Sequence, residues 1–130
     1  MKEPVWIREI EVLAFHTQQI VLFGGSEGVR DRGLLDSALA RPKNLFAYAE
    51  RALTMAELAA AYAVGISSNH PFVDGNKRTA MQVAFVFLDF NGFPVTASQE
   101  EACLTFLSLA AGEMTEEELA LWFAEHTSSQ

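Results

Sequence analysis

Residues 70–78 read His-Pro-Phe-Val-Asp-Gly-Asn-Lys-Arg, and no other segment of the chain holds a base candidate, a carboxylate, a glycine, an amide and two cations so close together. Apolar helical patterns flank the segment, over 54–69 before it and over 79–91 after it. Gly92 then provides a natural end for the second helix. The sequence therefore predicts a polar loop between two apolar helices, and this loop leads directly into the first turn of the second helix.

The end of the segment suits an anion, because the first N–H groups of a helix have no acceptor inside it and lie at the positive end of its dipole. Gly75 lets a ligand come close to the backbone, and Asn76 follows it at the helix start. Lys77 offers a compact charge and Arg78 a planar fork that suits phosphate oxygens. Cations at a helix start oppose the dipole, so a helix with only a structural role would rarely begin with them.

The remaining polar groups of the segment add chemistry to the anion site. Asp74 is a single carboxylate, and Mg²⁺ on a nucleotide usually needs only one or two from the protein. His70 can accept a proton near neutral pH. An anion site, a metal ligand and a base are together what phosphoryl or nucleotidyl transfer requires. Phe72 stands between polar neighbours, and we expect it to anchor the loop in the core.

The segment resembles the Fic/Doc motif, His-x-Phe-x-Asp/Glu-Gly/Ala-Asn-Gly/Lys-Arg, and matches it at every specified position. It is most similar to the Doc (death-on-curing) branch. Fic enzymes of the AMP-transferring branch have Gly where this chain has Lys77, and a second Arg where it has Met81. The resemblance extends to Gly-Val-Arg-Asp-x-Gly-Leu-Leu at 28–35 and to the spacing of the helices.

This resemblance implies an all-α, Fic/Doc-like bundle and the toxin of a type II toxin–antitoxin system. The toxin would be a protein kinase that uses Mg²⁺ and transfers phosphate from ATP to a hydroxyl of a translation protein. Elongation factor Tu is the typical substrate of the Doc branch. His70 would be the general base and Asp74 the metal ligand. Phosphate binding and charge balance would come from the rest of the loop, namely Gly75, Asn76, Lys77 and Arg78.

Two alternatives stay open. The same loop would serve AMP transfer to a protein hydroxyl if a different phosphorus faced the nucleophile, although Lys77 and Met81 favour phosphate transfer. The chain would otherwise be a non-catalytic binding module of the same fold, which the intact His70 and Asp74 argue against.

The resemblance also implies restraint by a partner. Some Fic enzymes carry an inhibitory Ser/Thr-x-x-x-Glu-Gly/Asn motif, which this sequence does not contain. We therefore expect a cognate antitoxin whose disordered tail folds into a helix on this chain.

Composition bounds the kind of protein. The length of 130 residues predicts a single domain, 1–130, with a real core. A net charge of −8 argues against DNA binding, which needs a basic face. The sequence shows no leader and no apolar run of membrane-spanning length, so we expect a cytoplasmic protein without membrane contact. The lone Cys103, expected as a buried thiol, suits a reducing compartment.

Helical periodicity predicts about six helices around a central buried helix, and no pattern favours a sheet. Three helix starts carry capping boxes, in which Ser or Thr precedes Glu by three residues, at Thr54, Ser98 and Thr115. The expected helices cover 7–22, the stretch from the cap Asp31 to Pro42, 54–69, 79–91, 99–111 and 116–126. A short helical turn is expected at 43–50, after Pro42. The helix 79–91 is apolar almost all round, so we expect it to be the buried one.

Two further features lie before the loop. Three glycines within 24–28 predict a break between helices, followed by a short extended piece at 29–30. In the resembling family this region is a flap near which a protein substrate docks, and a plain surface loop is the alternative. His16, within the first helix, is expected to be an ordinary surface or boundary residue.

Overall fold

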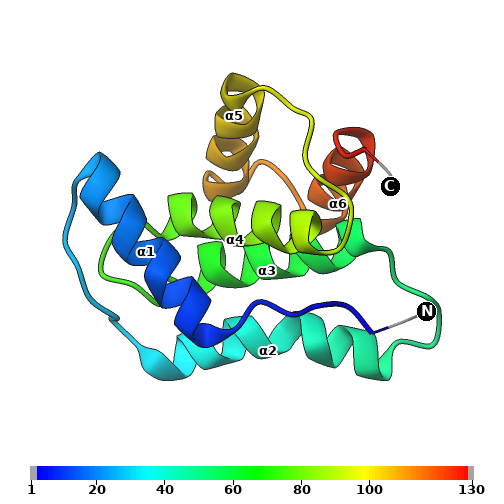
Figure 1. Cartoon of the computed structure of the whole chain (residues 1–130), viewed down its shortest axis with the longest axis horizontal. Coiled ribbons are helices and arrows are strands. Elements are labelled where there is room, and N and C mark those ends of the chain that lie inside the picture. The colour runs from blue at the N-terminus through cyan, green and yellow to red at the C-terminus, as the bar shows by residue number, and fades with distance from the viewer. Residues whose placement is uncertain (1–2, 129–130) are drawn as a thin grey trace.

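The computed structural model describes residues 3–128, which form six α-helices (Figure 1). In chain order these are α1 (Glu9–Phe23), α2 (Arg32–Tyr48), α3 (Met55–Asn69), α4 (Asn76–Phe90), α5 (Gln99–Ala110) and α6 (Glu116–Glu125). No strand forms within these residues, and extended backbone pairs only at two isolated bridges. The predicted all-α bundle is confirmed.

The central helix is α3. It contacts α2, α4, α5 and α6, and Figure 1 shows it between α2 on one side and the α5–α6 pair on the other. Every side chain over 58–63 is buried, and five alanines let the neighbouring helices approach closely. A central buried helix therefore exists, but the expectation that it is 79–91 is wrong. Phe90 of α4 is 46% exposed, because α1 and α5 cover only part of that helix.

Pro42 lies inside α2, so the prediction that it ends the helix is wrong. The proline has no N–H for the carbonyl of Ala38, four residues earlier. That part of α2 lies directly against Gly65 of α3, where an added Cβ would be only 3.3 Å from the backbone of Ala38. Pro42 itself is buried on the same stripe. Packing against α3 thus continues the helix through a residue that local propensity would place at its end.

The predicted caps are confirmed at every site. Thr54, Ser98 and Thr115 each accept a hydrogen bond from the N–H three residues later. The Glu carboxylate at that later position accepts one from the backbone N–H of the cap residue. Asp31 caps α2 by accepting from the Leu34 N–H at 2.9 Å.

Two other expectations have separate outcomes. Cys103 is exposed on α5 rather than buried, because the buried stripe of that helix runs through Ala102, Thr105 and Phe106. Among residues 3–128, no helix has both the length and the apolar character to cross a membrane.

Candidate active site

The loop between α3 and α4 begins at His70, which ends α3 in a left-handed conformation, with φ 49° and ψ 56°. His70 is the one non-glycine residue with positive φ in the described part of the chain. Its imidazole is exposed at the edge of the loop. Arg30 holds the turn, since its Nε donates to the His70 carbonyl at 2.7 Å and its Nη2 to the Asn69 carbonyl at 2.9 Å. These bonds satisfy carbonyls that the end of a helix leaves unpaired.

Phe72 anchors the loop, as predicted, and is only 1% exposed. The side-chain amide of Asn76 holds it by two bonds. Its Oδ1 accepts from the Phe72 N–H at 2.9 Å, and its Nδ2 donates to the Phe72 carbonyl at 3.0 Å. Asn76 was predicted to contact phosphate, and the structure commits its side chain to the loop instead. Its backbone N–H remains available to an anion.

His16 of α1 belongs to the same cluster, and the expectation of a surface or boundary residue is wrong. It is 4% exposed and stacks on Phe72, with ring centroids 3.9 Å apart and planes 7° apart. Its Nε2 lies 2.7 Å from the Asp74 carbonyl oxygen. A sequence signal exists, because Val12, His16 and Ile20 are spaced by four residues and share the buried stripe of α1.

The glycine-rich segment after α1 attaches directly to the loop. The N–H groups of Arg30 and Asp31 donate to the Pro71 carbonyl at 2.7 and 3.1 Å, and Val73 donates to the Gly28 carbonyl at 3.0 Å. The bridge between Val29 and Phe72 confirms the short extended piece predicted at 29–30. Both segments lie at the same end of the bundle (Figure 1). We call residues 24–31 the flap.

Asp74 presents an exposed carboxylate between the flap and α4. Its Oδ1 accepts from the Gly75 N–H at 2.8 Å and its Oδ2 from the Ser26 N–H at 3.2 Å. These two bonds, and then the nearby Arg78, lower the pKa of the Asp74 carboxyl below its usual value. The flap approaches so closely that a Cβ on Gly25 would lie 2.5 Å from Oδ2, so a side chain there would displace the carboxylate.

The start of α4 is open. Gly75 precedes it with φ 75° and provides no side-chain cap. Within residues 3–128, the N–H groups of Asn76, Lys77 and Arg78 have no acceptor, and the Lys77 ammonium has no hydrogen bond or ion pair. Unpaired N–H donors at the positive end of a helix are of the kind that binds anions in proteins.

The side chain of Arg78, in the first turn of α4, points back toward α1. Its Nη2 donates to the Gly24 carbonyl at 3.1 Å and its Nη1 to the Gln19 carbonyl at 3.4 Å. The guanidinium also lies 5.5 Å from the centre of the Phe23 ring. Arg78 thus joins the C-terminus of α1, and the root of the flap, to the first turn of α4. The sequence predicts a contact of Arg78 with phosphate, but not this link between α1 and α4.

A divalent ion could be held at Asp74 only with help from other ligands. No group of three or more His, Cys, Asp or Glu side chains gathers anywhere in the described residues. A single ionised carboxylate beside an anion site fits Mg²⁺ that arrives with a nucleotide, because phosphate oxygens and water complete its coordination.

Comparison with known proteins identifies the family of this chain. The sequence model described as "Fic/DOC family" matches residues 6–88, a range that includes the flap and the whole loop. The chain belongs to the Fic/Doc family. It is 37% identical over 105 residues to "Protein kinase doc" of Escherichia phage P1, in an alignment that covers 81% of this chain and 82% of the relative.

A second Fic/Doc relative is "Toxin Doc" of Mycolicibacterium smegmatis, which is 43% identical over 77 residues. That alignment covers 59% of each protein, so the likeness spans less than two thirds of this relative. The family resemblance expected from the motif is thereby confirmed.

Proposed function

We propose that this Fic/Doc protein is a toxin of the Doc type, a kinase that transfers phosphate from ATP to a hydroxyl of another protein. The observation that carries the proposal is the open start of α4, where unpaired N–H groups and Lys77 lie next to the ionised Asp74 and the exposed His70. The names of the two relatives, a protein kinase and a toxin, support the same function.

The roles follow from position and chemistry. His70, exposed at the loop edge, takes the proton of the attacking hydroxyl, which must come from a protein that docks against this surface. The free N–H groups at 76–78 bind phosphate oxygens, and Gly75 lets them approach the backbone. Lys77 and Arg78 balance the charge that grows on the transferred group.

Asp74 is the protein ligand of the proposed metal. Both of its oxygens already accept a backbone N–H, which fixes the carboxylate while leaving lone pairs for a cation. Mg²⁺ bound with ATP would neutralise negative charge on the phosphates.

Transfer of AMP is the second candidate. The same loop could present either phosphorus of ATP to the hydroxyl, but two residues favour transfer of phosphate over transfer of AMP. Lys77 stands where the AMP-transferring branch has Gly, and Met81, one turn further along α4, stands where that branch has a second Arg.

We further propose that the substrate is a translation protein, elongation factor Tu being the first to test. The chain would act in the cytoplasm as part of a type II toxin–antitoxin system, without binding DNA or a membrane. Its restraint would come from an antitoxin whose disordered tail folds into a helix on this chain.

Mass spectrometry of elongation factor Tu after incubation with this protein and Mg-ATP tests the proposal. We expect the added mass of one phosphoryl group, and none with a His70→Asn variant. An added adenylyl group would establish AMP transfer instead. An unmodified factor, together with unimpaired growth of cells that express the soluble protein without its partner, would contradict the toxin proposal.

A further inference from the structure

His16 is buried in the middle of α1, and a buried imidazole needs partners for its ring nitrogens. Its Nε2 lies 2.7 Å from the carbonyl oxygen of Asp74. A carbonyl oxygen can only accept, so Nε2 must carry the proton and donate it. The tautomer of His16 is thus fixed by the loop that it contacts.

The ring of His16 is held on its face as well as at its edge. Phe72 stacks on it at 3.9 Å and is itself held at both backbone groups by the amide of Asn76. On another side, the ring Cδ2 lies 3.8 Å from the place that a Cβ on Gly75 would occupy. The stacking on Phe72 and the hydrogen bond from Nε2 together orient the ring so that its N–H points at the peptide between Asp74 and Gly75.

That peptide is trans and planar, so its carbonyl and its N–H point in opposite directions. The carbonyl is directed toward α1 and His16. The N–H of Gly75 is directed the other way, where it donates to the Asp74 carboxylate at 2.8 Å. Rotation of this peptide would bring a carbonyl, instead of an N–H, toward the carboxylate and the open start of α4.

Glycine makes such a rotation easy, because Gly75 lacks the Cβ that restricts other residues to a few backbone conformations. The residue that permits close approach of an anion therefore also weakens the orientation of the peptide before it. His16 supplies a restraint on that peptide from a different helix.

We propose that His16 is a positioning residue of the transfer site, which holds the Asp74–Gly75 peptide so that its N–H faces the carboxylate and the anion site. The geometry stands by itself, whereas the effect on transfer rests on the proposed function. His16 does not contact the reacting groups, because it is buried beneath the loop.

A His16→Phe variant isolates the hydrogen bond, because phenylalanine keeps the stacking on Phe72 and has no ring N–H. We expect the amide NMR signals of Gly75 and Asn76 to move, and transfer from Mg-ATP to fall about tenfold, the value of one hydrogen bond. His16→Gln should restore most of both, since its side chain carries an N–H donor at a similar reach.

His126 offers a matched control. It also stacks on an aromatic ring, Trp122, with centroids 4.3 Å apart, and its Nδ1 lies 2.8 Å from the Trp122 carbonyl oxygen. His126→Phe also removes a ring N–H beside a stacked aromatic ring, together with the contact of Nε2 with Glu101 at 3.7 Å, but away from the loop. We expect unchanged Gly75 signals and unchanged transfer.

The outcomes separate this inference from the proposed function. Unchanged Gly75 signals and full transfer in a folded His16→Phe variant would overturn the role of His16. If the Gly75 signals move and binding of Mg-ATP weakens, but the wild-type protein modifies nothing, the positioning role stands and the proposed function fails. Should the variant not fold, the ring nitrogen signals of the wild-type protein decide, because a proton on Nδ1 with a bare Nε2 would overturn the proposal.

Discussion

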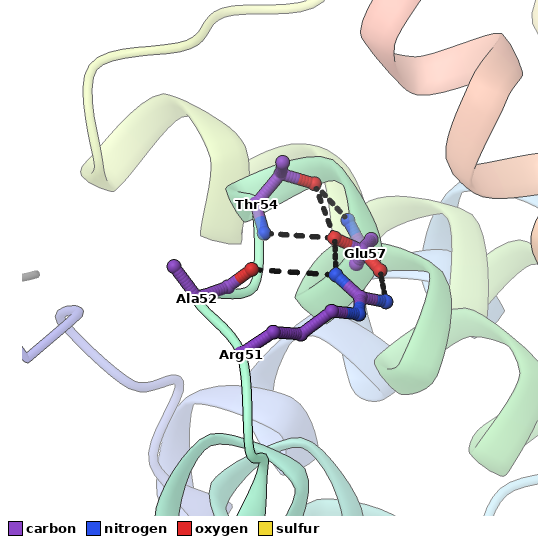
Figure 2. Close-up of polar contacts among 4 residues, drawn as sticks. All are labelled: Arg51, Ala52, Thr54 and Glu57. Atoms are coloured by element: carbon purple, nitrogen blue, oxygen red, sulfur yellow. Dashed lines mark hydrogen bonds and ion pairs between the residues drawn. The ribbon is translucent and has the colours of Figure 1, made fainter.

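The N-termini of α3 and α4 lie at opposite ends of an antiparallel helix pair and are built in opposite ways (Figure 1). At α3, Thr54 accepts from the Glu57 N–H at 3.1 Å, and the Glu57 carboxylate accepts from the Thr54 N–H at 3.0 Å. Arg51 forms an ion pair with the same carboxylate, as Figure 2 shows. At α4, Gly75 provides no cap and cations follow it.

This difference indicates which helix start has a function beyond structure. The same chain closes the starts of α3, α5 and α6 with the same device and places Glu in each first turn. Glycine in place of a capping side chain costs a few tenths of a kcal/mol, and cations at the positive end of a helix dipole add to that cost. A start left open at this cost, beside an ionised carboxylate and an exposed imidazole, is where a charged ligand is expected to bind.

Replacement of His70 by asparagine should have the largest effect, a loss of transfer of about 10²- to 10⁴-fold. Asparagine tolerates the left-handed backbone of residue 70, so this change removes the proposed base with little added strain. The exposed imidazole leaves no cavity behind. Transfer rates and circular dichroism would test this, with Arg51→Ala at the capped end as the control that keeps its rate. A folded variant with near wild-type turnover would remove His70 from the mechanism.

Asp74→Asn should come next, with a loss of at least about tenfold and a weaker response to Mg²⁺, because the one carboxylate of the site disappears. Glu57→Gln makes the same change of charge at the capped helix start and should leave the response to Mg²⁺ as it is. Activity measured across a range of Mg²⁺ concentrations distinguishes the two. An identical metal response in Asp74→Asn and the wild type would show that another group is the ligand.

Gly25→Ala should reduce transfer about tenfold, since a misplaced carboxylate disturbs the geometry on which transfer depends. The new Cβ would lie 2.5 Å from Asp74 Oδ2, which must then move. Gly24→Ala is the matched control, because Gly24 also has positive φ, 80°, but its added Cβ would meet no atom within 4 Å. Equal losses in both variants would mean that backbone strain alone, and not contact with Asp74, explains the effect.

The smallest effect on activity should come from the capped end. Thr54→Ala should lower the free energy of unfolding by about 1 kcal/mol and leave transfer unchanged. Denaturant unfolding of the two proteins, followed alongside transfer rates, checks both parts. Loss of transfer in a folded Thr54→Ala variant would contradict the claim that the start of α3 has only a structural role.

The same cap makes stability depend on pH. The bond with Arg51 lowers the pKa of Glu57 from 4.5 to about 2. The contribution of ionised Glu57 is therefore complete above pH 4.5 and disappears as the pH falls toward 2. Glu57→Gln should remove this part of the acid sensitivity, which unfolding at pH values across that window would measure.

The features that the sequence predicted correctly depend on neighbours close in the chain. A capping box is complete within four residues, so those at Thr54, Ser98 and Thr115 could be identified without knowledge of packing. The loop motif is equally local, and Phe72 could be placed in the core from its polar surroundings.

The features that were missed depend on contacts between distant segments. The helix α2 continues through Pro42 because Gly65 of α3 lets the two helices approach closely. The sequence around Pro42 gives no sign of this contact with Gly65. The apolar sequence of α4 predicted that α4 is buried on all sides. Instead α3 is the central helix, because its alanines let the neighbouring helices pack closely against it. The bond from His16 to the Asp74 carbonyl spans 58 positions.

Two-dimensional amide NMR of the isotope-labelled protein during titration with Mg-ATP tests the central claim most directly, that the open start of α4 is the anion site. We expect saturable shifts of the Asn76, Lys77 and Arg78 amides, and none at 55–57 in the capped first turn of α3. Shifts of equal size at both helix starts, or none at α4 while the nucleotide binds elsewhere, would contradict it.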